Sequence, residues 1–244
     1  MNVKYVHNTD VHNTKAAQEV VPLIIKYFNP KSVIDIGCGI GTWLEVFARF
    51  GIEILGVDGD YVNKKMLHIS KDYFIEADLE NDILDHLGRF DIVINLEVAE
   101  HIKESSANHH VNNLCTLSDI IIFSAAVPGQ GGQNHINEQW LDYWTKKFNT
   151  HGFVLRDCFR SNLWNNANID WWYKQNMVVF QKASENEEND PIISYFHPDN
   201  FMIKLDEINA LNHYVNKVNN GSLGLKWVLS IMVRTLRRKL WKTT

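Results

Sequence analysis

The glycines at positions 37, 39 and 41 are the feature of the sequence with the most direct chemical meaning. Segment 33–42 reads VIDIGCGIGT, so the glycines follow a β-branched run immediately. Glycines at such a junction let the backbone turn sharply and approach a ligand closely. Position 42 is threonine, so the dinucleotide fingerprint G-x-G-x-x-G fails, and no Gly-Lys-Ser/Thr of a P-loop is present. Asp35 would face a diphosphate badly, so the loop favours a ligand that is cationic nearby.

Acidic residues also end the next predicted strands. Asp58 ends the second strand, 21 residues after Gly37, where a carboxylate can accept hydrogen bonds from ribose hydroxyls. Ala77-Asp78-Leu79 follows the third strand, and its carboxylate can accept from an adenine amino group. Both acids also have a plainer interpretation. The sequence Val-Asp-Gly-Asp around Asp58 could form an ordinary turn, and Asp78 could cap a helix that begins near Asn81. The fourth strand ends in NLEVAEHI at residues 95–102.

Two histidines are candidates for proton transfer. His101 follows the fourth strand, and His135 lies in the loop after the fifth strand, within GGQNHINEQW at residues 131–140. An imidazole has a pKa close to neutrality and can remove the proton of a hydroxyl acceptor. His101 could equally be structural, opening a helix, whereas the glycines before His135 suit a mobile lid. Cys38 fits the loop as a small residue and is not expected to be a nucleophile.

These residues need a scaffold, and strand and helix patterns alternate from residue 14 to about residue 181. Near-continuous apolar runs predict parallel strands buried on both faces, with crossover helices between them. The predicted strands cover 32–36, 53–57, 73–76, 91–95, 119–125, 153–158 and 172–181. The predicted helices cover 16–28, 43–50, 81–87, 102–117 and 139–148. Asn137 suits the N-cap of the last helix, and Ile136 with Leu141 its hydrophobic staple. His109 and His110 are predicted to lie on the surface.

Four motifs in this order resemble the class I S-adenosylmethionine-dependent methyltransferases: DIGCGIGT, Asp58, Asp78-Leu79 and NLEVAEHI. The resemblance covers roughly residues 14–181. It implies an α/β fold, a doubly wound, Rossmann-like sheet of seven strands, mostly parallel with one antiparallel strand. It also implies S-adenosylmethionine as cofactor and no metal. The residues it assigns to the cofactor are Asp35, Gly37, Cys38, Gly39, Gly41, Thr42, Trp43, Asp58, Gly59, Ala77, Asp78, Leu79, Asn95, Leu96 and Glu97.

The segments GGQNHINEQW, RDCFR (156–160), LWN (163–165) and WWYKQN (171–176) further resemble a subgroup found in bacterial capsule and lipopolysaccharide biosynthesis. That resemblance implies O-methylation of a sugar hydroxyl or of a phosphate-type sugar decoration, with His135 and His101 as catalytic residues. Aromatic faces can stack on sugars, and amides can bind their hydroxyls, although the tryptophans could equally be core. The substrate-binding candidates are Asn134, Asn137, Gln139, Trp164, Trp171 and Trp172.

Two other functions stay open from the sequence. The acceptor could be a small metabolite such as a quinone or lipid precursor, or the domain could be a non-catalytic, cofactor-binding scaffold of a glycan-assembly complex. The Asn/Asp-Pro-Pro-aromatic motif of base-amine methyltransferases is missing, since residues 95–98 read NLEV. The metal-binding acids of the catechol type are not visible either.

Charge is distributed unevenly along the 244 residues. Residues 221–244 carry six basic side chains and no acid, while the preceding 220 residues carry 18 basic and 29 acidic side chains, a net charge of −11. A body this acidic is a poor binder of nucleic acid. Three dispersed cysteines give no disulfide framework or zinc site, and the polar N-terminus resembles no signal peptide. We therefore expect a cytoplasmic protein.

The C-terminal part is predicted to be an appendage to the sheet. We expect a methyltransferase domain over 1–181, an acidic linker or loop over 182–190, and a helical extension over 191–244. Within it, residues 223–241 place Leu225, Val228, Leu229, Met232, Leu236 and Leu240 on one helical stripe, with basic residues toward the end. Such a helix can lie on the inner membrane face, contact a glycan-assembly partner or pack on the domain. The sequence does not indicate the oligomeric state.

Overall fold

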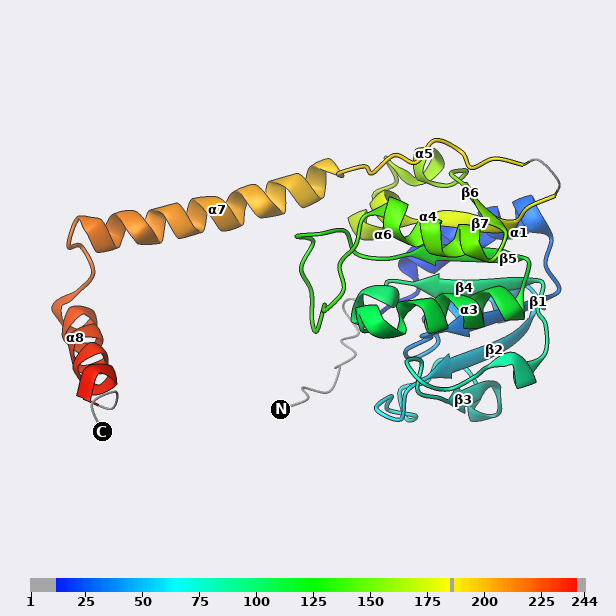
Figure 1. Ribbon diagram of the computed structural model, residues 1–244, viewed down its shortest axis with the longest axis horizontal. Coiled ribbons are helices and arrows are strands. Elements are labelled where there is room, and N and C mark those ends of the chain that lie inside the picture. The colour runs from blue at the N-terminus through cyan, green and yellow to red at the C-terminus, as the bar shows by residue number, and fades with distance from the viewer. Residues whose placement is uncertain (1–11, 185–186, 241–244) are drawn as a thin grey trace. The chain divides into compact units, whose positions relative to one another are not determined.

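The computed structural model describes residues 12–184 and 187–240, and it contains the predicted seven-stranded sheet (Figure 1). The strand order is β3-β2-β1-β4-β5-β7-β6. The first five strands pair in parallel, whereas β7 runs antiparallel to both β5 and β6. The single antiparallel strand that the family resemblance implied is therefore β7.

The strands are short. They are β1 (Ser32–Ile36), β2 (Glu53–Asp58), β3 (Phe74–Glu76), β4 (Ile92–Leu96), β5 (Ile120–Ser124), β6 (Phe153–Arg156) and β7 (Val178–Lys182). The α-helices are α1 (Lys15–Phe28), α2 (Thr42–Arg49), α3 (Ala107–Leu117), α4 (Leu141–Thr150), α5 (Arg160–Leu163), α6 (Trp171–Asn176), α7 (Pro198–Asn219) and α8 (Leu225–Leu240). Short 3-10 helices cover Lys71–Tyr73, Asp85–Leu87, Ala99–His101 and Glu104–Ser106.

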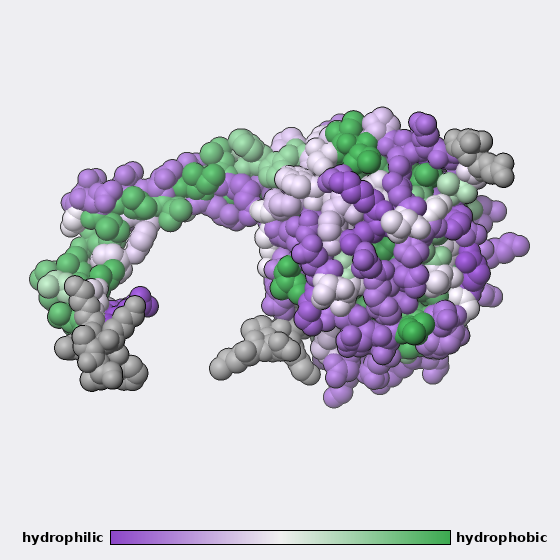
Figure 2. Space-filling view, in the orientation of Figure 1, coloured by the Kyte–Doolittle hydropathy of each residue, from purple (hydrophilic) through white to green (hydrophobic). Residues whose placement is uncertain are grey.

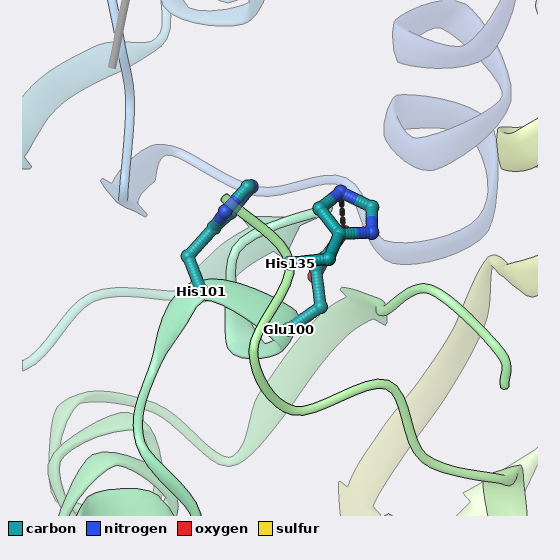
Figure 3. Close-up of side chains that lie close together, drawn as sticks. All are labelled: Glu100, His101 and His135. Carbon is teal, nitrogen blue, oxygen red and sulfur yellow. Dashed lines mark ion pairs between the residues drawn. The ribbon is translucent and has the colours of Figure 1, made fainter. Parts of the chain in front are cut away.

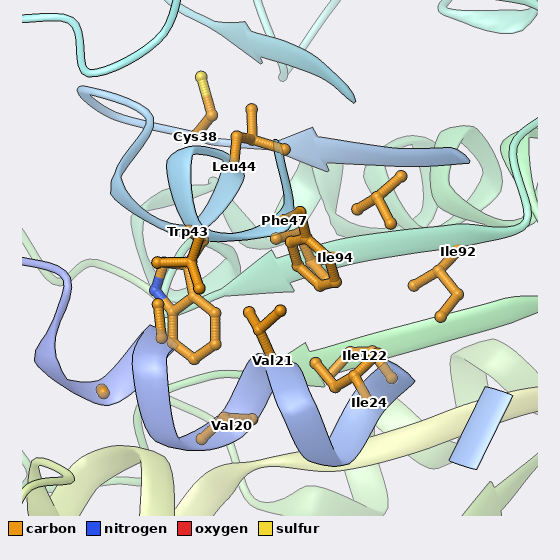
Figure 4. Close-up of a cluster of buried hydrophobic side chains, with 14 of the residues drawn as sticks. Val20, Val21, Ile24, Cys38, Trp43, Leu44, Phe47, Ile92, Ile94 and Ile122 are labelled. Atoms are coloured by element: carbon orange, nitrogen blue, oxygen red, sulfur yellow. The ribbon is translucent and has the colours of Figure 1, made fainter. Parts of the chain in front are cut away.

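Helices cover both faces of the sheet because successive strand residues point to opposite sides. Val33 packs with α1, α2, α5 and α6, whereas its neighbour Ile34 packs with α3 and α4. Figure 4 shows the first of these layers, where Val20, Val21 and Ile24 of α1 meet Phe47 of α2. The two layers together hold the carboxyl ends of β1, β2 and β4 at one edge.

An aromatic cluster fastens the antiparallel part of the sheet to α4. Phe148 of α4 stacks on Phe180 of β7 with ring centroids 3.8 Å apart, and Phe123 of β5 meets both rings. All three side chains are buried. Aromatic pairs in this arrangement add to the free energy gained from burial alone. The cluster fixes α4, and with it the loop that precedes α4.

Three element predictions were wrong. The predicted strand 172–181 is instead helix α6 followed by strand β7, and Tyr173 of α6 packs edge-on against Trp43, with ring centroids 5.2 Å apart. Segment 81–87 forms only a 3-10 turn. Helix α4 begins at Leu141 with Trp140 as its N-cap residue, so Asn137 caps nothing. The expected hydrophobic staple is also missing, since Ile136 is 60% exposed.

The chain divides into two compact units, one ending at His197 and the other beginning at Pro198. Residues of the acidic segment belong to the first unit, where Asn189 accepts a hydrogen bond from the Leu155 amide and Asp190 accepts one from the Asp157 amide. The second unit contains α7 and α8. None of the helices within residues 12–184 and 187–240 is both long and apolar enough to cross a membrane.

Candidate functional site

The glycine loop between β1 and α2 is held in a conformation that only glycine adopts readily. Gly37, Gly39 and Gly41 all have positive φ angles, of 86°, 54° and 79°. A Cβ atom on Gly37 would also lie 2.4 Å from Cγ2 of Val98. Cys38 is buried, and its burial raises the pKa of the thiol well above the usual value. The cysteine therefore packs in the loop and is not activated as a nucleophile.

Asp58 lies at the end of β2 and points toward this loop. Its carboxylate accepts hydrogen bonds from the backbone amides of Gly39 and Gly59, both at 2.6 Å. The Tyr61 hydroxyl donates to the same oxygen as Gly59. Asp58 is thus joined to the glycine loop, and one of its oxygens already accepts from a hydroxyl group.

Two carboxyl groups lie together beneath the loop. Asp35 and Asp58 are both buried, and burial raises the pKa of each, with repulsion from Asp58 adding to the effect at Asp35. A cation bound nearby would offset this cost of burial. Thr42 and Trp43, the other predicted contacts of this loop, are buried at the start of α2.

The predicted adenine contact has a local role in the structure. Asp78 accepts hydrogen bonds from the Glu80 amide and the Asn81 side chain, which lowers the pKa of its carboxyl group. It is exposed and follows β3 by two residues. Its neighbours Ala77 and Leu79 hold this turn against the sheet, since the Ala77 amide donates to the Asp58 carbonyl and Leu79 is buried.

Asn95 and Leu96, predicted to bind the cofactor, contribute to packing at the end of β4. The fully buried Asn95 donates to the Ile36 carbonyl at 2.6 Å, and its Oδ1 lies 3.3 Å from Nε2 of His110. His110 was expected on the surface and is buried instead. Leu96 packs against the layer of α1 and α2. These side chains join β4 to β1 and α3.

Glu97, also predicted to bind the cofactor, belongs to a different set of contacts from those of the glycine loop. Its φ angle is 54°, an unusual value for a residue with a side chain. Its carboxylate accepts from the amides of Gln130 at 2.9 Å and Asn176 at 3.2 Å. Burial raises the pKa of Glu97, and these hydrogen bonds act in the opposite direction. The network connects the end of β4 to the loop after β5 and to α6.

The two candidate bases meet beside a buried carboxylate (Figure 3). The rings of His101 and His135 pack edge to face with centroids 4.9 Å apart, and Nε2 of His135 lies 3.9 Å from Oε1 of Glu100. Glu100 is completely buried. Two imidazoles from different segments therefore share one small space with an acid that the sequence did not point to.

The loop after β5 is fastened over this cluster by backbone hydrogen bonds. The amides of Ile136 and Asn137 both donate to the Glu100 carbonyl at 3.0 Å. The Glu138 carboxylate accepts from the amides of Gly129 and Gly131 at 2.7 and 2.6 Å. These contacts close the loop on itself and hold His135 at its position.

Glu138 also orients the ring of His135. Its carboxylate lies 2.9 Å from Nδ1 of the ring, and its own pKa is lowered by its hydrogen bonds to His135 and to the loop amides, although burial opposes this. An ionised carboxylate can only accept, so Nδ1 carries a proton, and in the neutral ring Nε2 is then the acceptor. Nε2 is the nitrogen that points toward Glu100.

The electrostatics of the cluster follow from burial. Burial and the nearby His135 lower the pKa of His101 to about 4, so its ring is neutral at physiological pH. Burial, and repulsion from Glu97 and Glu138, raise the pKa of Glu100 well above its usual value. Among the described residues no donor reaches the Glu100 carboxylate with good geometry, although the Glu100 and Ala126 amides lie near enough to favour its ionised form.

The same groups could hold a metal ion, which the sequence did not predict. Glu100, His101 and His135 offer one carboxylate oxygen and two ring nitrogens, all within 4.8 Å of one another. Neutral imidazole and carboxylate ligands suit a divalent cation such as Zn²⁺. A buried carboxylate without a good donor would also be satisfied by such an ion.

The predicted substrate residues lie in two places. Three belong to the loop over the cluster: the Asn134 carbonyl lies 3.3 Å from Nδ1 of His101, and Asn137 accepts from the side chain of Gln139. Asn137 is buried and supports the loop.

The three tryptophans lie elsewhere in the first unit. Trp164 packs against Tyr195 and His197, whereas Trp171 and Trp172 contact each other on α6. Trp172 also contacts Tyr173, which packs on Trp43. These rings pack on their own neighbours and do not join the histidine cluster.

Sequence reasoning missed four residues of the site, namely Glu100, Gln130, Glu138 and Asn176. For Glu138 and Glu100, closeness in sequence to a candidate histidine could have suggested a role. Glu138 follows His135 by three residues, and Glu100 adjoins His101. Asn176 ends the segment WWYKQN but was not named as a site residue, and Gln130, 46 residues before it, carried no signal.

Comparison with known proteins shows which family the chain resembles. The family described as a methyltransferase domain matches residues 11–175. A stretch of 91 residues is 32% identical to ubiquinone biosynthesis O-methyltransferase of Bartonella quintana, covering 34% of this chain and 36% of that protein. The chain thus matches little more than a third of that relative's length.

Solved structures show the same fold. The methyltransferase domain of bacterial CtHen1 superposes with a TM-score of 0.51 at 20% identity, covering 68% of this chain and 98% of that one. The small RNA methyltransferase HEN1 gives a TM-score of 0.53 at 14% identity, covering 80% of this chain and 28% of that one. Because the family match spans more than half of the sequence and includes the glycine loop, the chain belongs to the methyltransferase-domain family.

Proposed function

We propose that the protein is an O-methyltransferase that acts on a hydroxyl group of a small metabolite, such as a phenolic quinone precursor. The observation that carries this is the cluster of His101, His135 and Glu100, because a hydroxyl must lose a proton as it takes a methyl group. The relatives named for ubiquinone biosynthesis support a small-metabolite acceptor over the sugar hydroxyl expected from the sequence. Packing of Trp164 against Tyr195 and His197 weakens the argument for a sugar-stacking surface.

In this proposal the cofactor lies along the carboxyl ends of β1 and β2. Asp58 would accept from the ribose hydroxyls, as it does from Tyr61, and Asp35 would favour the positive charge of the donor. Methyl transfer from a sulfonium is an in-line displacement, so the protein mainly supplies alignment and a dry site. The cofactor supplies the methyl group itself.

The acceptor would lie against Nε2 of His135. Glu138 keeps the proton of that ring on Nδ1, so Nε2 can take the hydroxyl proton as the oxygen attacks the methyl group. His101 has a lowered pKa and stays neutral beside it, so it adds no positive charge that would oppose this proton transfer. The loop held to the Glu100 carbonyl would exclude water.

A divalent cation fits the same donor set. Glu100, His101 and His135 would hold it, and when bound it would lower the pKa of a hydroxyl in contact with it. We place the activity in the cytoplasm as part of the proposal.

The test is release of S-adenosylhomocysteine from S-adenosylmethionine over a panel of acceptors. The panel contains catechols and other phenols with and without an alkyl tail, nucleotide sugars and oligosaccharides. We expect turnover with phenols, reduced about 100- to 10,000-fold in His135→Ala with little change in cofactor affinity. His86→Ala, which removes an exposed histidine of a 3-10 turn, is the matched control and should keep full activity.

The other outcomes are informative. Turnover of sugars without phenols would restore the polysaccharide assignment. Silence across the panel, with the cofactor bound, would support a non-catalytic scaffold. If a chelator abolishes turnover and one divalent cation restores it, the cluster of Glu100, His101 and His135 binds that cation. If the chelator leaves turnover unchanged, His135 removes the proton without a cation.

A further inference from the structure

Helix α8 carries an exposed apolar stripe. Leu225, Leu229, Met232 and Leu236 recur at spacings of three and four residues, which places them on one side of the helix. Each side chain is at least half exposed, and Leu225 reaches 74%. Figure 2 shows apolar residues gathered along α7 and α8. Apolar surface of this kind on a helix is usually covered by something.

The other helix of the same unit does not cover the stripe. Trp227 of α8 contacts Tyr214 of α7, with ring centroids 6.0 Å apart. Trp227 is offset from the stripe by more than a quarter turn on either side and is less exposed than its members. The face of α8 that meets α7 is therefore different from the face that carries the leucines.

Charge on α8 is of one sign. Arg234 and Arg238 lie on the side of the helix opposite the stripe, the side that carries Trp227, whereas Lys226 and Arg237 flank the stripe about a quarter turn away. Residues 221–244 contain six basic side chains and no acid, whereas residues 1–220 carry a net charge of −11. Helix α8 therefore lies in the part of the chain best suited to an anionic surface.

Pairing with a second copy of the helix fits these charges poorly. Two such helices meeting along their stripes would bring the flanking Lys226 and Arg237 of both copies together with no acid to compensate them. An anionic lipid surface satisfies both features at once, since acyl chains cover the stripe and headgroups neutralise the basic side chains.

We propose that α8 is an interfacial helix that binds the surface of an anionic membrane, with Leu225, Leu229, Met232 and Leu236 inserted among the lipids. Binding of this kind requires no spanning segment, in keeping with the absence of one among the described helices. It would bring the enzyme to acceptors dissolved in lipid, a consequence that rests on the proposed function, although the binding itself does not.

The test is co-sedimentation of the full chain with vesicles. Vesicles of phosphatidylglycerol and phosphatidylcholine are compared with phosphatidylcholine alone, at low and at physiological salt. We expect binding to the anionic vesicles that weakens as salt rises. The double variant Leu229→Glu, Leu236→Glu should lower the partition coefficient at least tenfold. The matched control Ile208→Glu, Leu211→Glu changes similarly exposed residues of α7 and should stay within twofold of the parent chain.

A second pair of variants tests the charge. Arg237→Glu with Arg238→Glu should lower binding to anionic vesicles at least tenfold, because each basic residue near such a surface contributes to attraction. Lys204→Glu with Lys217→Glu makes the same change in net charge on α7 and should have a much smaller effect.

Several results would overturn the inference. These are equal binding by the parent chain and the α8 variants, an equal loss in the α7 controls, or no vesicle binding together with a dimer that the α8 variants dissociate. Turnover of a water-soluble phenol separates this inference from the proposed function. The rate of this turnover should be the same in the α8 variants as in the parent chain. If the parent chain shows no turnover, that result counts against the proposed function and not against membrane binding by α8.

Discussion

At the scale of single residues, the site depends on side chains that hold one another in a particular protonation state. Glu138 holds the proton of His135 on Nδ1, and burial keeps His101 neutral. Glu100 is buried with only weak donors near it, which is costly for a carboxylate. None of these properties belongs to an isolated side chain.

Asp58 provides a direct test of the cofactor site at this scale. Asp58→Asn should weaken binding of S-adenosylhomocysteine about 10- to 100-fold, because charge-assisted hydrogen bonds to the ribose would be lost. The measurement is isothermal titration calorimetry of the full chain. Asp60→Asn changes an exposed acid two residues away and is the matched control. Equal affinity in the two variants would remove Asp58 from the site.

At the scale of elements, helix α3 is fastened to the sheet by polar groups buried beneath the site. His110 of α3 contacts Asn95 of β4, and Asn95 in turn donates to the end of β1. These contacts explain how an amide predicted to bind cofactor serves the fold. The same contacts hold His110 in a buried position, where its ring is neutral at physiological pH.

The pH dependence of stability tests this link. Burial lowers the pKa of His110 to about 4, below the usual 6.5 of an unfolded chain. The neutral ring therefore stabilises the fold fully above pH 6.5, and this contribution is lost as pH falls toward 4. Relative to His110→Gln, the native chain should lose about 2 kcal/mol of unfolding free energy between pH 7 and pH 5.

The measurement is urea denaturation of both chains at each pH. Other groups that titrate are common to the two proteins and cancel in the difference. A difference between them that does not change with pH would show that His110 is not held neutral by burial.

At the scale of the whole molecule, the division of charge decides which partners the chain can meet. The fold is shared with a small RNA methyltransferase at 14% identity, but residues 1–220 carry a net charge of −11. Phosphate contacts supply most of the affinity of nucleic-acid binders, and an acidic body lacks them. Similarity of fold therefore gives no reason to expect an RNA acceptor.

The net negative charge of residues 1–220 predicts weak binding of RNA. A labelled RNA duplex at physiological salt should bind the full chain with a Kd weaker than about 100 µM, measured by fluorescence anisotropy. The variant Arg237→Glu, Arg238→Glu reports any contribution of α8. A Kd in the low micromolar range that survives this variant would contradict the prediction and reopen nucleic acid as an acceptor.

The sequence alone determined the parallel strands of the sheet and the tight turn of the glycine loop. Apolar runs such as 91–95 predict buried parallel strands because both faces of a parallel sheet are covered. Gly37 and its neighbours predict a close backbone turn, because positive φ angles favour glycine. These signals are local, so they can be recognised without knowing what lies around them.

The tertiary structure alone decided the composition of the site. Glu100 and His135 are 35 residues apart, and they meet because the loop after β5 donates two hydrogen bonds to the Glu100 carbonyl. Asn176 reaches Glu97 from helix α6, which replaces the first part of the strand predicted over 172–181. Aromatic residues favour strands by propensity, but packing of Tyr173 on Trp43 overrides that preference. Contacts of this kind depend on which surfaces meet, and a linear pattern of residues does not record that.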